Sequence, residues 1–307
     1  MNAIHSSSTG GALLVSGASG ALARQVVELL LRYRPHVPVI AITRTPHKLE
    51  DLAARGVLVR FADFDQPDSL DAAINGASRM LLVSTNTPDA PPRRATQHGN
   101  AIESAGRCGV QHVVYTSFAT AGAEVPSPIA ADHAATEQIL HRGRMGFSIL
   151  RNAFYAELLL ATIPFASESG RLPCAPGRGR MTLVARADCA AAAAAALVDG
   201  FDGRRVLSIA GEESLDAHQL ASLASEVLGT VIEAVETSPD QLETAWLQCG
   251  ASPGMARVFA GIDRSTATGD MEVPRSNLRE LLSALPGLTP TGMREFLTAH
   301  KTLFVRK

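Results

Sequence analysis

The first half of the chain alternates short apolar runs with longer segments of helical pattern. Strands that are apolar throughout, each followed by a helix, are typical of a parallel sheet that is covered on both faces. The alternation therefore predicts an α/β fold built on a doubly wound parallel sheet. The expected strands are 12–16, 37–43, 57–61, 80–84, 113–116 and 147–150, and the expected helices are 21–33, 46–55, 67–75, 93–108 and 130–142.

The second half is less regular and predicts a smaller, mixed α+β portion. An expected strand at 206–209 is followed by Ser214, which we expect to cap a helix that ends at Leu228. This portion is expected to pack at the carboxyl edge of the sheet, where open α/β sheets bind ligands. A strand at 231–235 and helices at 239–249, 255–261 and 291–300 complete the pattern.

A glycine-rich turn lies between the first expected strand and the first helix, and reads Gly17-Ala-Ser-Gly20-Ala-Leu-Ala23. Gly17 permits a tight turn, Gly20 lets a pyrophosphate approach the backbone, and the small Ala23 permits close packing of helix on strand. In this strand–turn–helix context the motif predicts dinucleotide binding rather than an ordinary loop. N–H groups at the helix start would face the phosphates, and the further residues expected there are Ser19, Ala21 and Leu22.

The end of the second expected strand carries a basic residue. An acidic residue at this place holds the ribose 2′-hydroxyl of NAD, whereas an arginine suits the 2′-phosphate of NADP. Arg44 follows the turn by about 20 residues, the separation that this contact requires, and Lys48 lies one helical turn further on. The sequence therefore predicts NADP(H) as the cofactor, the alternative being that Arg44 is a solvated loop residue.

Polar side chains also follow the third, fourth and fifth strands. Asp63, which precedes Phe64, could contact the adenine or could cap the helix expected near Pro67, and the sequence leaves both alternatives open. Polar residues at strand ends commonly line such a cleft, although they also simply end strands. The further cofactor-binding candidates on this ground are Ser84, Thr85, Asn86 and Thr116.

The composition argues against several other classes of protein. A net charge of −2 and a pI near 6.5 disfavour a domain built to coat nucleic acid. The four cysteines are far apart and form no metal-binding pair, which is typical of a reduced, cytoplasmic chain. The most apolar run, 189–198, is too short to span a membrane, and the N-terminus lacks the pattern of a secretory signal. We expect no nucleic-acid partner, no membrane association and no metal, and a homodimer is compatible with these features.

Several segments together resemble the atypical short-chain dehydrogenase/reductase group that includes NmrA-like proteins. The nearest resemblance is to its branch of NAD(P)H:quinone oxidoreductase type 2 and triphenylmethane reductase. The segments that carry it, in family order, are 17–23, Ala62-Asp63-Phe64, Tyr115-Thr116-Ser117, His133-Ala-Ala-Thr136-Glu137, Leu150-Arg151-Asn152-Ala-Phe-Tyr155 and Ala185-Arg186-Ala-Asp188.

The resemblance implies a Rossmann-type sheet with a smaller portion that closes over the cleft. The implied organisation is a flexible tail at 1–11, an NADP-binding Rossmann core at 12–155, and a mixed substrate-cleft portion at 156–307 that is interleaved with the core. The proline-rich loop 87–94 is longer than is typical of the family, so the resemblance does not fix the shape of the substrate entrance. By the same resemblance the nicotinamide and substrate cleft is lined by Asn152, Phe154, Tyr155 and Arg186, with Thr85, Asn86 and Thr116 beside the cofactor.

Lysine and tyrosine are scarce, and this limits the proton chemistry. Many members of the wider superfamily use a Tyr-x-x-x-Lys pair, in which the ammonium lowers the pKa of the phenol so that it can move a proton. This chain has no such pair, and interconversion of alcohols and ketones by that route is disfavoured. The lysines are Lys48, Lys301 and Lys307, and the tyrosines are Tyr33, Tyr115 and Tyr155.

Reduction of a quinone makes a smaller demand, because the nicotinamide supplies the hydride and the protein mainly orients the rings and stabilises charge on a quinone oxygen. Asn152 or Tyr155 is expected to donate a hydrogen bond to that oxygen, and His133 to supply a proton. The alternatives are a locally bonded His133 and a Tyr155 packed in the core. We expect an NADPH-dependent reductase of a quinone or another small electrophile, such as a triarylmethane dye or an enone. The alternative function is an NmrA-like, non-enzymatic dinucleotide sensor that acts through a protein partner.

Overall fold

The computed structural model describes residues 11–85, 93–122, 128–177 and 179–304. It divides into two compact units, neither of which is a continuous stretch of chain. The N-terminal unit comprises residues 1–152, 189–207 and 277–289, and the C-terminal unit comprises residues 153–188, 208–276 and 290–307. Apart from Gly11, the tail expected at 1–11 lies outside the described residues.

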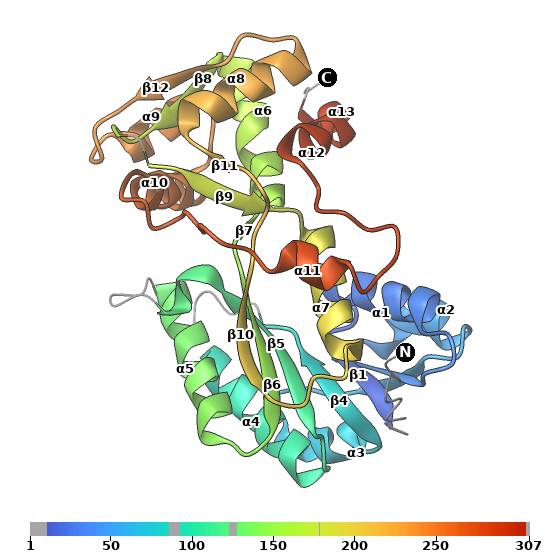
Figure 1. Ribbon diagram of the computed structural model, residues 1–307. Coiled ribbons are helices and arrows are strands. Elements are labelled where there is room, and N and C mark those ends of the chain that lie inside the picture. The colour runs from blue at the N-terminus through green and yellow to red at the C-terminus, as the bar shows by residue number, and fades with distance from the viewer. Residues whose placement is uncertain (1–10, 86–92, 123–127, 178, 305–307) are drawn as a thin grey trace. The chain divides into compact units, whose positions relative to one another are not determined.

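A seven-stranded sheet forms the centre of the N-terminal unit (Figure 1). Its strand order is β10-β6-β5-β4-β1-β2-β3, and the strands from β6 through β3 run parallel. The order 3-2-1-4-5-6 is that of doubly wound dinucleotide-binding folds, so the expected parallel sheet is confirmed. The strands are β1 (Ala12–Ser16), β2 (Val39–Thr43), β3 (Leu58–Phe61), β4 (Ala77–Leu82), β5 (His112–Phe118), β6 (Gly146–Asn152) and β10 (Arg204–Ile209).

Helices cover both faces of this sheet. The face that holds Leu14, Ile40 and Tyr115 packs against α3, α4 and α5 in one hydrophobic core, and α1 and α7 lie on the opposite face (Figure 1). Within the described ranges, none of the helices combines the length and the apolar content needed to cross a bilayer. The helices are α1 (Ala21–Tyr33), α2 (Glu50–Ala53), α3 (Leu70–Ile74), α4 (Arg93–Arg107), α5 (Pro128–Arg142), α7 (Arg186–Val198) and α11 (Leu278–Leu282), with 3-10 turns η1 (Pro46–Leu49), η2 (Pro67–Ser69) and η3 (Ala119–Gly122).

Two of the expected helices begin as 3-10 turns. The pattern predicts single helices at 46–55 and 67–75, whereas the structure has η1 followed by α2 and η2 followed by α3. Each turn starts with a proline, Pro46 or Pro67. Proline suits the first turn of a helix because its missing N–H would have no partner inside the helix there.

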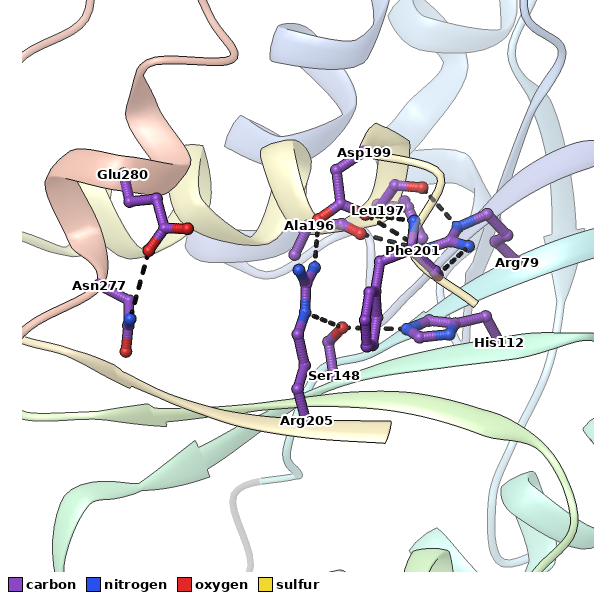
Figure 2. A network of polar contacts seen from close by, with 10 residues as sticks. All are labelled: Arg79, His112, Ser148, Ala196, Leu197, Asp199, Phe201, Arg205, Asn277 and Glu280. Atoms are coloured by element: carbon purple, nitrogen blue, oxygen red, sulfur yellow. Dashed lines mark hydrogen bonds and ion pairs between the residues drawn. The ribbon is translucent and has the colours of Figure 1, made fainter. Parts of the chain in front are cut away.

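Strand β4 begins at Ala77, three residues before the apolar run that predicts it, and includes a buried arginine. Arg79 is only 5% exposed. Its guanidinium satisfies carbonyl groups at the C-terminus of α7, where the partial negative charge of a helix favours a cation. The tertiary partner therefore explains a charged residue in an otherwise apolar strand. The carbonyl acceptors are Ala196 at 3.1 Å, Leu197 at 2.8 Å and Phe201 at 2.8 Å, and Asp199 lies 3.6 Å away (Figure 2).

The C-terminal unit combines small sheets with helices, as expected for a mixed portion. One sheet has the order β11-β9-β7 and the other pairs β12 with β8. Its core includes Trp246 and Phe259, whose ring centroids lie 4.9 Å apart. The elements are β7 (Phe154–Tyr155), η4 (Ala156–Leu158), α6 (Leu159–Ser169), β8 (Arg171–Cys174), β9 (Met181–Val184), β11 (Ser214–Leu215), α8 (Ala217–Leu228), β12 (Glu233–Glu236), α9 (Leu242–Gln248), α10 (Pro253–Ala267), α12 (Met293–Ala299) and α13 (Lys301–Phe304).

The helix cap expected at Ser214 is wrong, because Ser214 lies in β11. The N-cap of α8 is Asp216, whose carboxylate accepts the Gln219 N–H at 2.8 Å. The Gln219 side chain in turn accepts the Asp216 N–H at 3.1 Å. This reciprocal pairing satisfies two helix donors at once, and it selects Asp216 over the nearby serine.

Candidate dinucleotide site

The turn after β1 leaves backbone donors open at the start of α1. Gly17 has a φ of +61°, the left-handed region that favours glycine, and its carbonyl accepts the Gly20 N–H at 2.8 Å. Gly20 is the N-cap of this 13-residue helix, which has no side-chain cap and no acidic residue in its first turn. The first N–H groups of α1 are therefore available to an anion, and the helix dipole favours one.

This turn forms part of a large pocket within the N-terminal unit, at the carboxyl ends of β1 to β4. The pocket contains about 1580 Å³ of space, including the part that is open to solvent. Its size and position suit a dinucleotide. The cofactor-binding candidates that it brings together are Gly17, Ser19, Gly20, Arg44, Asp63, Phe64, Ser84 and Thr85. Ala21 and Leu22 belong to the first turn of α1, Thr116 is buried beside Ser84, and Asn86 lies outside the described residues, as does most of the loop 87–94.

Two cations of this pocket form no ion pair with a described residue. Arg44, directly after β2, and Lys48, in η1, are exposed, and neither side chain forms a hydrogen bond or ion pair with a described residue. Arg93 differs, because it binds Asp65 at 2.6 Å. The Arg93 guanidinium, with smaller effects from Gln97 and Arg44, holds the pKa of Asp65 below its usual range against the effect of burial. Unpaired cations near a helix N-terminus fit a ligand that carries phosphate at two places.

Hydroxyl groups bridge the glycine turn and the end of β2. Ser19 Oγ lies 2.8 Å from Thr43 Oγ1, which also accepts the Thr45 N–H at 3.1 Å. Sequence reasoning missed both threonines, although they flank Arg44 in a Thr-Arg-Thr run. It also missed Arg93 and Gln97, which α4 brings to the pocket from beyond the fourth strand. No local spacing signals these two, because their place depends on how α4 packs.

Asp63 lines the pocket but does not cap the following helix. Its carboxylate accepts the Asp65 N–H at 3.0 Å and the Gln66 side chain at 3.3 Å. The N-cap of η2 is Gln66, without a side-chain cap. Of the two alternatives that the sequence leaves open, the structure removes capping, and it shows that the carboxylate shapes a local turn at the pocket wall.

The chain that leaves β4 is held by side chains from three other elements. The N–H groups of Val83 and Ser84 donate to Ser16 Oγ at 2.9 Å and Thr116 Oγ1 at 2.8 Å. The Thr85 N–H donates to His98 Nε2 at 3.0 Å, and the Thr85 carbonyl accepts from Arg94 at 2.8 Å. Because Val83, Ser84 and Thr85 line the pocket, these contacts fix its wall. The side chains that hold this segment are Ser16 from β1, Thr116 from β5, and Arg94 and His98 from α4.

His98 belongs to a buried polar cluster with Tyr115 and His133. His98 Nδ1 lies 2.9 Å from Thr136 Oγ1, and His133 Nδ1 lies 2.8 Å from the Tyr115 hydroxyl. Since His98 Nε2 accepts the Thr85 N–H, the neutral ring carries its proton on Nδ1. Burial lowers the pKa of His98 and of His133 to about 3, with further lowering by Arg94. Both imidazoles are therefore neutral at physiological pH, and burial raises the pKa of the Tyr115 hydroxyl.

Two of the segments that carry the resemblance are joined by a buried ion pair. Arg151 donates to both carboxylate oxygens of Glu137, at 3.0 and 2.6 Å, and Ser117 donates to the same group at 2.6 Å. Glu137 is only 5% exposed, so the pair secures α5 against β5 and β6. Asn152, at the end of β6, is also buried. These contacts indicate a structural role for Glu137 and Arg151.

The remaining candidates lie in the C-terminal unit. Phe154 and Tyr155 form β7, which pairs with β9 at Leu183 and Val184. The Arg186 guanidinium lies 5.4 Å from the centre of the Tyr155 ring. The Arg186 N–H donates to Glu157, both of whose carboxylate oxygens lie at 3.1 Å. Tyr155 and Arg186 are therefore neighbours, which residues that line the same substrate cleft must be.

Comparisons with known proteins agree with this geometry. A family profile described as NAD(P)H-binding matches residues 17–200. Quinone oxidoreductase 2 of Escherichia coli is 32% identical over 88% of this chain and 93% of its own length. An NmrA-like family domain-containing oxidoreductase of Aspergillus flavus is 26% identical over 94% of this chain and 95% of its own. The chain in the structure of Citrobacter sp. triphenylmethane reductase complexed with NADP(H) has 28% sequence identity to this chain. The superposition covers 94% of this chain and 99% of that chain, with a TM-score of 0.84. The chain therefore belongs to the NAD(P)H-binding family, in the NmrA-like oxidoreductase branch of quinone oxidoreductase 2 and triphenylmethane reductase.

Proposed function

We propose that this chain is an NADPH-dependent reductase that transfers a hydride to a quinone or a similar small electrophile. The cofactor preference rests on two cations, Arg44 and Lys48, that form no ion pair with a described residue and line a pocket large enough for a dinucleotide. The acceptor class is supported by relatives that are a quinone oxidoreductase and a triphenylmethane reductase. Bound NADPH would supply the hydride, and the protein would supply binding, orientation and charge stabilisation.

Different residues of the pocket are proposed to bind different parts of the cofactor. In this proposal the open N–H groups at the start of α1 bind the pyrophosphate, and the glycine turn lets it approach. Arg44 and Lys48 bind the 2′-phosphate, with the hydroxyls of Ser19, Thr43 and Thr45 beside them. The anchored chain of Val83 to Thr85 forms the opposite wall. Each of these proposed contacts uses a backbone N–H group or a side chain that lies at the pocket wall or at the start of α1.

Stabilisation of the acceptor is assigned to Tyr155 and Asn152, as hydrogen-bond donors to a developing oxyanion. Arg186 lies close enough to the Tyr155 ring to favour the charged form of the acceptor through its positive field. His133 is buried and neutral, and its contact with Tyr115 suits a structural role better than proton donation. No lysine occurs between Lys48 and Lys301, so a Tyr-x-x-x-Lys relay takes no part in the proposed reaction.

Substituting Arg44→Ala tests the cofactor assignment. Loss of a charge-assisted contact with phosphate is worth about 1.5–3 kcal/mol, which corresponds to a roughly tenfold to hundredfold weaker Kd for NADPH. The Kd for NADH should stay within about twofold, because NADH lacks the 2′-phosphate. Arg32→Ala, at the exposed end of the same unit's α1, is the matched control and should change neither Kd. Equal affinity of the unmutated protein for both cofactors would refute the assignment.

Oxidation of NADPH, followed optically with a panel of quinones and triarylmethane dyes, tests the reaction itself. We expect turnover of at least one acceptor. Tight binding of NADPH without oxidation by any of them would contradict the reductase and favour a dinucleotide sensor.

A further inference from the structure

A second cavity lies inside the C-terminal unit. It contains about 730 Å³ of space, part of it open to solvent. Its walls come from α6, β8, α9, α10 and the start of α8, and are largely apolar. None of the described residues that we associate with the cofactor or the acceptor lines it. Representative wall residues are Leu159, Leu172, Trp246, Phe259 and Ile262.

Two carboxylates, Asp216 and Asp263, lie on this largely apolar wall. Asp263, on α10, accepts the indole N–H of Trp246 on Oδ2 at 2.6 Å. No described residue donates to its other oxygen, and no described cation lies within 4 Å of it. Burial raises the pKa of Asp263 to about 7, opposed by the Trp246 hydrogen bond and the more distant Arg264. An ionised carboxylate here is costly to desolvate, and a cationic ligand would offset that cost.

The other ionisable groups on the cavity wall are Asp216, His218 and Cys174. The Asp216 carboxylate caps α8, and His218 Nε2 lies 3.8 Å from Glu236. Burial raises the pKa of the Cys174 thiol to about 11, so the thiol is neutral. Of the two described carboxylates on the wall, Asp263 is the one that lies beside the Trp246 ring.

We propose that this cavity binds a small aromatic cation, with the charge beside Asp263 and the ring against Trp246 and Phe259. An aromatic cation suits the site because its apolar body is cheap to desolvate, while indole and phenyl faces attract positive charge. A neutral aromatic compound would gain only the apolar contact. The proposal goes beyond the reductase function and does not depend on it.

The intrinsic fluorescence of the protein offers a direct readout, because Trp246 is its only tryptophan and lies in the cavity wall. The probes are trimethylphenylammonium, a permanent cation, and tert-butylbenzene, its neutral isostere. We expect both to shift Trp246 emission, and the cation to bind at least about tenfold more tightly at pH 8. Between pH 8 and pH 5 this advantage should fall at least about tenfold, because Asp263 takes up a proton while neither probe titrates.

Asp263→Asn retains an acceptor for the Trp246 N–H and removes the charge, so it should abolish the advantage of the cation while leaving tert-butylbenzene binding intact. Asp240→Asn, an exposed carboxylate of the same unit outside the cavity, is the matched control and should retain the advantage. Equal affinities of the two probes at pH 8 in the unmutated protein, an advantage independent of pH, or no binding of either probe would overturn the proposal. These measurements on the unmutated protein decide the question even if Asp263→Asn fails to fold.

Discussion

Replacing Arg79 by methionine tests how a buried guanidinium stabilises the N-terminal unit. Arg79 joins β4 to the C-terminus of α7 through three carbonyl groups, at distances of 2.8 to 3.1 Å. Methionine has a similar length and keeps the apolar part of the contact, but it donates no hydrogen bond. The change therefore isolates the polar contribution of the guanidinium (Figure 2).

The expected magnitude follows from which groups lose their partners. Asp199 keeps Arg205 and the Phe201 N–H, the latter at 3.0 Å, so no charge is left unpaired. The loss falls on the three carbonyls, and each buried polar group without a partner costs about 1–3 kcal/mol. Removing the desolvation cost of the cation offsets part of this sum. We therefore expect Arg79→Met to lower the free energy of unfolding by about 3–5 kcal/mol.

Urea unfolding measures this difference. The unfolding is followed by far-UV circular dichroism rather than by tryptophan emission, because Trp246 lies in the other unit and its emission reports on that unit. Arg79→Lys should lose less, because an ammonium keeps the charge but cannot reach all three carbonyls. Arg24→Met removes an exposed ion pair with Asp51 and, as the control, should change stability by less than about 1 kcal/mol. A loss below about 1 kcal/mol for Arg79→Met, with an unchanged m-value, would refute the reasoning.

Two further predictions concern the buried histidines of the N-terminal unit. His98 and His133 have a pKa of about 3 in the folded protein, well below the ordinary value. Folding therefore favours their neutral forms, so their contribution is complete above pH 6.5 and is lost as pH falls toward 3, at up to about 1.4 kcal/mol per pH unit for each. Urea midpoints that stay constant from pH 7.5 to 5 would contradict this. His98→Leu removes the acceptor of the Thr85 N–H and should weaken NADPH binding about tenfold, whereas His98→Gln should restore most of it, as measured by NADPH fluorescence titration. Unchanged binding by His98→Leu would show that the pocket wall does not need this contact.

The site could be predicted from sequence where its chemistry is local. The glycine turn, the strand before it and the helix after it lie within about 20 residues, so their geometry depends on backbone preferences that neighbouring residues encode. The place of Arg44 at the pocket could be predicted for the same reason, because it stands at a strand end at a fixed distance from the turn. The contribution of α4 could not be predicted, because the packing of α4 on the sheet places Arg93 and Gln97 in the pocket and His98 against Thr85 in its wall.

The amino-acid sequence by itself determined the parallel sheet and the dinucleotide turn, because hydrophobic periodicity and turn chemistry are properties of adjacent residues. The resemblance to the family is carried by its motif segments. Only the tertiary structure decided the burial and the hydrogen-bond partners of several side chains. Arg79 is buried because α7 returns to it more than 100 residues later, at Leu197. Asp63 shapes a turn instead of capping a helix, and Asp263 faces an apolar cavity beside Trp246. The energies of such groups depend on desolvation and on distant partners, which only the folded chain brings together.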